Sequence, residues 1–78
     1  MGDTGREGLP DGGLLSTAEF VAAVNLRRPK GTMPLTVRTC LLCIAAGEIE
    51  RYRPGKRRWK IPEHEVPRFV RDYRWRPS

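Results

Sequence analysis

The first apolar stretch of the chain follows a strong helix-start signal at residues 15–20, which read Leu-Ser-Thr-Ala-Glu-Phe. Ser16 can accept a hydrogen bond from the backbone of Glu19, and the Glu19 carboxylate can reach back to Ser16, which is the capping-box arrangement. Apolar residues then recur at helical spacing. The pattern predicts a first helix from Thr17 to about Asn25 that buries one apolar face.

A second helix is predicted after a loop that spans residues 26–35, where two prolines and a glycine interrupt the apolar pattern. Thr36 is a suitable N-cap for this helix. Gly47 can take the left-handed conformation that ends it. The expected inner stripe of the helix is Val37, Cys40, Leu41 and Ile44.

A basic β-hairpin is predicted next. Residues 51–60 hold six cations, and Pro54-Gly55 marks a bend. The hairpin register is chosen so that Ile49 and Ile61 share one face with Trp59. This register pairs Ile49 with Ile61, Arg51 with Trp59, Arg53 with Arg57, Glu50 with Lys60 and Tyr52 with Arg58. Like charges opposed at the tip favour a bound phosphate, and a merely solvated charge run is the alternative.

A third helix is predicted from residues 62–65, whose acidic side chains suit a helix N-terminus. Pro67 must fall within the first turn or mark the start of the helix, because it lacks an amide donor. The predicted inner stripe is Val66, Phe69, Val70 and Tyr73. The expected organisation is a flexible glycine-rich leader at 1–13, one domain at 14–73 and a basic, aromatic tail at 74–78.

Composition narrows the function of so short a chain. The chain has 78 residues and a formal net charge of +6, and residues 50–78 hold ten cations against four anions. A domain of this size buries too little surface for a deep enclosed active site. A basic face on such a domain points first to nucleic acid, and less often to an anionic membrane or an acidic protein.

Candidate chemistry is sparse. Cys40 and Cys43 are the only cysteines and His64 is the only histidine, so a zinc site lacks ligands and two small buried residues are expected instead. With no acidic pair in a pocket and no glycine-rich phosphate loop, neither an enzyme nor a cofactor is expected. No apolar run is long enough to span a bilayer, and no secretory signal is recognised, so a cytoplasmic protein is expected.

Three stretches resemble the excisionase and MerR-like DNA-binding family. Residues 15–20 look like its opening "L-[ST]-x-x-E". Residues 36–49 are similar to its second helix, "S-x-x-T-V" followed by "G-x-[LI]". Residues 58–66 resemble its "R-W-R-I-P-x-x-E-V" segment. The likeness covers Leu15 to Val70. The longer loop, with Arg27-Arg28-Pro29, resembles phage lambda-type excisionases in particular.

The resemblance implies an α+β fold, namely a small winged helix-turn-helix with two short helices, a basic β-hairpin wing and a C-terminal helix. It also implies a recombination directionality factor. Such a protein binds repeated sites in double-stranded attachment-site DNA, self-associates cooperatively there, bends the DNA and directs a tyrosine integrase toward prophage excision.

DNA-binding residues are then predicted from three segments. In the second helix, Arg38 and Thr39 would face the major groove, while Leu42, where many relatives carry arginine, could contact a thymine methyl. The wing would enter a minor groove, and the loop would grip phosphates. The full set is Arg27, Arg28, Lys30, Arg38, Thr39, Leu42, Arg53, Lys56, Arg57, Arg58 and Lys60.

Two other functions compete with the excisionase. A small winged-helix transcriptional regulator would share the fold and the DNA contacts. A protein-binding adaptor would instead dock on an acidic partner through Tyr73, Trp75 and Leu42. Failure to bind any duplex at low salt would favour the adaptor.

Overall fold

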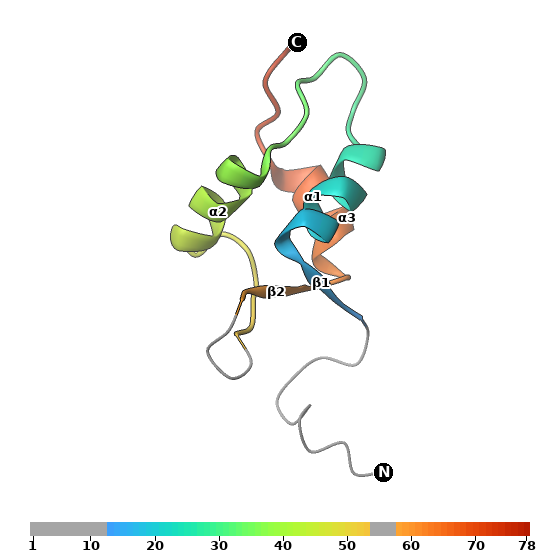
Figure 1. The fold of residues 1–78 in the computed structure, drawn as a ribbon. Helices are drawn as coiled ribbons and strands as arrows, with labels where there is room; N and C mark the ends of the chain where they lie inside the picture. Colours follow the sequence, from blue (N-terminus) through green and yellow to red (C-terminus); the bar gives the residue numbers. More distant parts are fainter. Residues whose placement is uncertain (1–12, 54–57) are drawn as a thin grey trace.

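The computed structural model describes residues 13–53 and 58–78. Within these ranges the chain forms three helices and a two-stranded antiparallel sheet, so its fold is α+β (Figure 1). The elements in chain order are β1 (Leu14–Ser16), α1 (Thr17–Leu26), α2 (Val37–Ala45), β2 (Lys60–Pro62) and α3 (Glu65–Asp72). Lys56 and Arg57, and the predicted leader apart from Gly13, lie outside the described residues. None of the described helices could span a bilayer.

Helix α1 is the central element, since it packs against α2, α3 and both strands. The capping box is confirmed: the Glu19 amide donates to Ser16 Oγ at 3.1 Å, and the Ser16 amide donates to Glu19 Oε1 at 2.8 Å. Phe20 is fully buried and meets Phe69 of α3 edge to face, with ring centroids 5.5 Å apart. This aromatic contact fastens the first helix to the third.

Helix α2 begins and ends as the sequence predicts. Thr36 accepts the Thr39 amide at the N-terminus. At the C-terminus Gly47 has φ 77°, its amide donates to Ile44, and the Glu48 amide donates to Cys43. These two bonds form a Schellman motif, which turns the chain sharply toward the buried Ile49.

We predict that Gly47→Ala destabilises the protein by about 1 kcal/mol, because alanine is strained at positive φ. An added Cβ would meet no atom within 4 Å, so the cost comes from the backbone alone. Urea unfolding followed by circular dichroism measures it. An unchanged unfolding midpoint would show that the turn relaxes without strain.

The inner face of α2 differs from the predicted stripe. Cys40, Cys43 and Ile44 are buried, whereas Val37 and Leu41 are 43% and 44% exposed. Expecting those two in the core was therefore wrong, and expecting both cysteines there is confirmed. Burial raises the pKa of the Cys40 thiol to about 11. A helix that packs mainly on α1 from one side cannot bury a stripe wide enough to include Val37 and Leu41.

The sheet also corrects the predicted hairpin. β1, which the pattern did not predict, pairs with β2 so that Leu15 lies opposite Ile61. On the other side of β2, Tyr52 pairs with Lys60 in an isolated bridge, with N···O distances of 2.8 and 2.7 Å. The predicted register, with Tyr52 opposite Arg58, is wrong by two residues. A shift of two keeps every side chain on its expected face, so the buried pattern could not detect it.

Proline explains why the pairing with β2 does not continue from the Tyr52–Lys60 bridge back to Glu50. In an antiparallel ladder the next hydrogen-bonded pair after Tyr52 and Lys60 would join Glu50 to Pro62. Pro62 has no amide hydrogen to give. Residues 49–51 therefore run beside β2 without a ladder and are held by side chains instead.

Helix α3 resolves the position of Pro67, which falls in the first turn, where an amide would have no helical acceptor. Its predicted inner stripe is confirmed: Val66 and Phe69 are buried, and Val70 and Tyr73 pack against the core. Tyr73 stacks on Phe69 at 4.8 Å between ring centroids.

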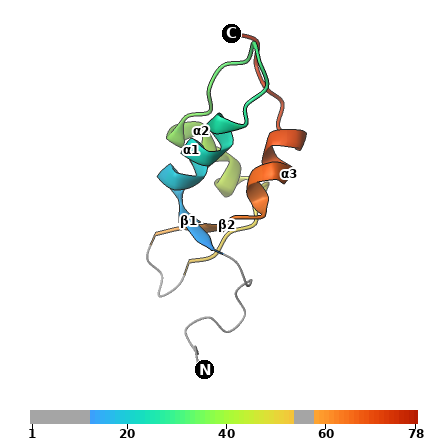
Figure 2. The same ribbon diagram turned by 90° about the vertical axis from the view of Figure 1, so that its right-hand side faces the viewer.

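The predicted loop and tail lie side by side, at the end of the molecule away from the sheet (Figures 1 and 2). Thr32 pairs with Pro77, and the Met33 amide donates to the Arg76 carbonyl at 2.8 Å. Trp75 Nε1 donates to the Val70 carbonyl at 3.0 Å. The tail is therefore packed against the fold.

Candidate nucleic-acid interface

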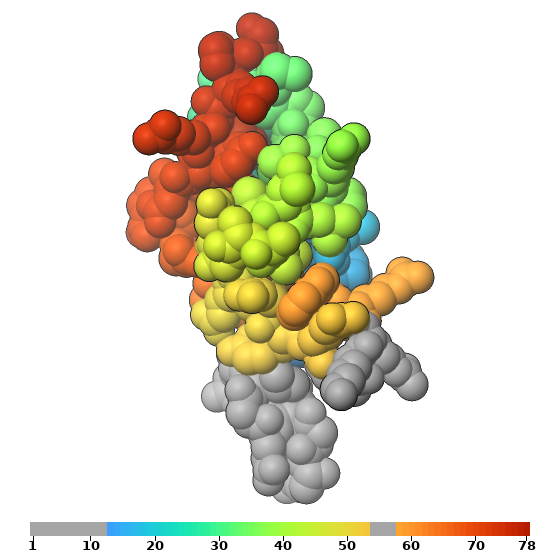
Figure 3. All heavy atoms as spheres, turned by 90° about the vertical axis from the view of Figure 1, so that its left-hand side faces the viewer, coloured from blue at the N-terminus to red at the C-terminus, as the bar shows by residue number. Residues whose placement is uncertain are grey.

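An open groove of about 360 Å³ separates α2 from the start of the predicted wing. Its lining combines three apolar side chains, one threonine and two arginines. The residues are Thr17, Val37, Leu41, Arg53, Arg58 and Trp59. Figure 3 shows α2, residues 48–53 and the residues just before β2 on one face of the molecule. Two of the predicted wing arginines thus lie beside the helix that was expected to read DNA.

Trp59 contacts two neighbouring cations, Arg51 and Arg53, and the second of these lines the groove. The guanidinium carbons of Arg51 and Arg53 lie 5.5 and 5.0 Å from the centroid of its ring. At these distances the ring attracts both cations and restricts their positions. Trp59 itself packs against the core, so the fold holds in place the ring that both guanidinium groups approach.

The outward side of α2 continues from the groove. Arg38 follows Val37 in the first turn and is exposed, and Leu42, one turn later, is 63% exposed. Thr39 is only partly exposed, and its Oγ1 accepts a hydrogen bond from the Thr36 hydroxyl at 3.1 Å. Arg38 and Leu42 are therefore better placed than Thr39 to meet a ligand.

The loop cations lie elsewhere. Arg27, Arg28 and Lys30 belong to the loop at the far end of the molecule from the sheet (Figure 1). Arg28 donates to the Thr32 carbonyl, which gives it a role in shaping this loop. The loop is also fixed through Asn25, whose side chain bonds both the amide and the carbonyl of Leu35, at 2.8 and 2.9 Å. The structure does not bring these cations to the groove.

Lys60 is separated from the groove in another way. It alternates along β2 with Ile61, which is fully buried. Successive side chains of a strand point to opposite faces. Lys60 therefore lies on the face opposite Ile61 and Trp59, together with Tyr52.

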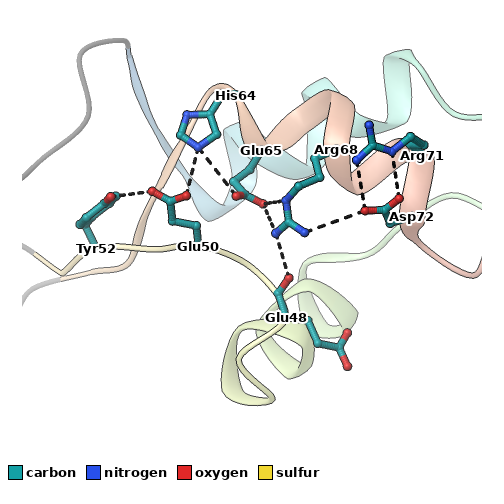
Figure 4. Close-up of polar contacts among 8 residues, drawn as sticks. All are labelled: Glu48, Glu50, Tyr52, His64, Glu65, Arg68, Arg71 and Asp72. Carbon is teal, nitrogen blue, oxygen red and sulfur yellow. Dashed lines mark hydrogen bonds and ion pairs between the residues drawn. The ribbon is translucent and has the colours of Figure 1, made fainter.

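A polar network joins the chain that leaves α2, the segment before the wing, and α3 (Figure 4). Its centre is Glu65, whose side chain is only 3% exposed and accepts from Arg68 Nε at 3.0 Å and from Arg68 Nη2 at 2.6 Å. The same Nη2 donates to the Glu48 carbonyl at 3.3 Å. Arg68 therefore ties α3 to the chain that leaves α2.

Glu50 extends this network toward the wing. Its carboxylate accepts the Tyr52 hydroxyl at 2.6 Å and lies 3.1 Å from His64 Nε2. The hydrogen bond from Tyr52, and then the one from His64, lower the pKa of the Glu50 carboxyl. Stability from these bonds is present at neutral pH and is lost as the pH falls through that lowered pKa. These two side-chain contacts hold Glu50 in place, whereas Pro62 opposite it has no amide hydrogen to donate.

Comparisons with protein-family models, curated proteins and solved structures found no significant match. The residues of this chain are therefore the evidence for its function. What they offer is a fixed cationic and apolar surface made by α2 and the chain on either side of residues 54–57.

Sequence reasoning missed part of this surface. It placed Val37 and Leu41 in the core. It assigned Trp59 to the same hairpin face as Ile49 and Ile61 but did not predict its contacts with arginine. One signal was available: α2 has apolar side chains at 37, 40, 41, 42, 43 and 44, more than one face of a nine-residue helix can bury. Some of these side chains had to be exposed.

Proposed function

We propose that the protein is a winged-helix DNA-binding protein that acts as an excisionase. It binds attachment-site repeats, bends them and directs a tyrosine integrase toward excision. Helix α2 is the recognition helix, residues 51–60 form the wing, and the protein catalyses no covalent step itself. The excision role rests on the sequence resemblance, and the DNA contacts rest on the surface described above.

One observation carries the DNA proposal: Arg53 and Arg58 share a groove with Val37 and Leu41 of α2. An element in the major groove and a neighbouring element in the next minor groove can contact one duplex only if they face the same side. Had the arginines lain on the reverse face, as Lys60 does, a single duplex could not reach both. The shared groove supports a combined contact by helix and wing.

The charge distribution supports a backbone-dominated complex. If about six cations of α2 and the wing contact phosphates, the logarithm of the affinity should fall with the logarithm of salt with a slope near −5. Fluorescence anisotropy of a labelled duplex between low and physiological salt measures this slope. A slope flatter than about −2 would contradict the assignment of the wing to DNA.

A reconstituted reaction tests the excision role. An attachment-site plasmid is incubated with the cognate integrase, with and without this protein, and excised circles are counted. Dependence of excision on the protein supports the proposal. DNA binding without any effect on excision would leave the runner-up, a transcriptional regulator with the same DNA contacts.

A further inference from the structure

The outward side of α2 exposes three large aliphatic side chains next to a single cation. Val37, Leu41 and Leu42 are 43%, 44% and 63% exposed, and Arg38 lies between them in sequence. Single exposed leucines are ordinary on protein surfaces. Three such side chains within six residues of one helix form an apolar patch, which is typical of a binding surface.

The surroundings of the patch favour a polyanion as its occupant. Arg38 adjoins it on the helix, and Arg53 and Arg58 line the groove into which Val37 and Leu41 project. Among the described residues that line this groove there is no carboxylate. A duplex offers phosphates to the arginines and, at its base edges, apolar atoms to the patch.

The chemistry of base edges identifies those apolar atoms. In the major groove each base presents hydrogen-bond donors and acceptors, and thymine alone adds an apolar group, its 5-methyl. Leu42 lies four residues after Arg38, so the two side chains are neighbours on the helix surface. A helix that offers one arginine and adjacent leucines can therefore read a guanine and the thymines beside it.

We infer that Leu42 and Leu41 contact thymine 5-methyl groups next to the base pair read by Arg38. The preferred half-site then contains thymines in the major groove beside a guanine. This inference rests on the proposed DNA binding and adds the class of base that α2 selects.

The test removes the methyl groups and nothing else. The preferred duplex is first selected from a random-sequence pool, and each thymine is then replaced by deoxyuridine, which keeps the hydrogen-bonding edge of thymine. At contacted positions the affinity should fall by about threefold to fourfold per methyl group, the value of one buried carbon. Elsewhere in the duplex the replacement should have no effect.

Variants assign the effect to the patch. Leu42→Ala should weaken binding to the thymine duplex by a similar factor and should no longer distinguish thymine from deoxyuridine at its position. Leu26→Ala is the matched control, because Leu26 is 89% exposed at the end of α1 and lies outside the patch. Circular dichroism confirms that both variants fold.

The outcomes separate the inference from the function beneath it. Equal affinity for thymine and deoxyuridine duplexes, with sequence-selective binding intact, would overturn the methyl contacts and leave DNA binding standing. Absence of any duplex binding would remove both. If Leu42→Ala left DNA affinity unchanged and instead abolished association with integrase or between copies, the patch would be a protein-docking surface and the inference would be wrong.

Discussion

Replacing Arg53 and Arg58 together with alanine is expected to weaken binding to duplex DNA of any sequence by about 100-fold at physiological salt. A charge-assisted hydrogen bond to a phosphate contributes about 1.5 kcal/mol or more, which is roughly tenfold per arginine. The two arginines flank the groove beside α2, where phosphates of one strand would pass. Anisotropy titrations with the preferred duplex and with a scrambled duplex measure the loss, and the salt slope should become flatter by about 2.

Two comparisons decide whether position or charge is responsible. Arg71→Ala/Arg74→Ala lowers the net charge equally but removes exposed arginines from α3 and the segment after it. That variant should retain most of its affinity. Arg38→Ala should instead change which sequence is preferred, because arginine reads guanine in the major groove. If all three variants lost affinity equally for both duplexes, the division between recognition helix and wing would be wrong.

The helices of this chain could be predicted because their boundaries are set by local chemistry. The side chains of Ser16 and Glu19 each accept a hydrogen bond from the other residue's backbone amide. Thr36 caps α2, and Gly47 supplies the left-handed turn. These interactions span a few residues and leave a direct trace in the sequence. Their partners are already determined before the chain folds.

The sheet could not be predicted as well, because its pairing depends on distant residues. β1 has three residues and leaves no periodic pattern, and nothing local indicates that it lies beside β2. The hairpin register shifted by two without changing any buried face. The one clue was Pro62, whose missing amide forbids a hydrogen-bonded pair with Glu50 and so limits the ladder.

The candidate site was predicted only in part, again because it depends on contacts between distant residues. The basic segment before β2 is visible as composition, and two of its arginines do lie beside α2. The exposed aliphatic side chains of α2 could not be predicted, because their exposure depends on how much of the helix surface α1 covers. The buried Glu65 was equally hidden, since an acidic first helical turn looks the same whether it is exposed or enclosed.

Replacing Arg68 with methionine is expected to destabilise the protein by about 2–3 kcal/mol. Methionine keeps an apolar stem of similar length but leaves the Glu65 carboxylate, only 3% exposed, without its main partner. A buried group deprived of its charged partner loses its compensation for desolvation. A domain of 78 residues has roughly 4–10 kcal/mol of stability, so the melting temperature should fall by about 10–20 °C.

A second substitution identifies the cause of that loss. Glu65→Gln in the Arg68→Met background removes the unpaired charge, so the double variant should be more stable than Arg68→Met alone. Arg71→Ala is the matched control, because Arg71 pairs with Asp72 and both side chains are more than half exposed, so its melting temperature should scarcely change. If the double variant lost the sum of both single effects, the cost would lie in the Arg68 contact with the Glu48 carbonyl. Either way, the loss would loosen α3 from the chain that leads α2 into the wing, and DNA affinity should fall with stability.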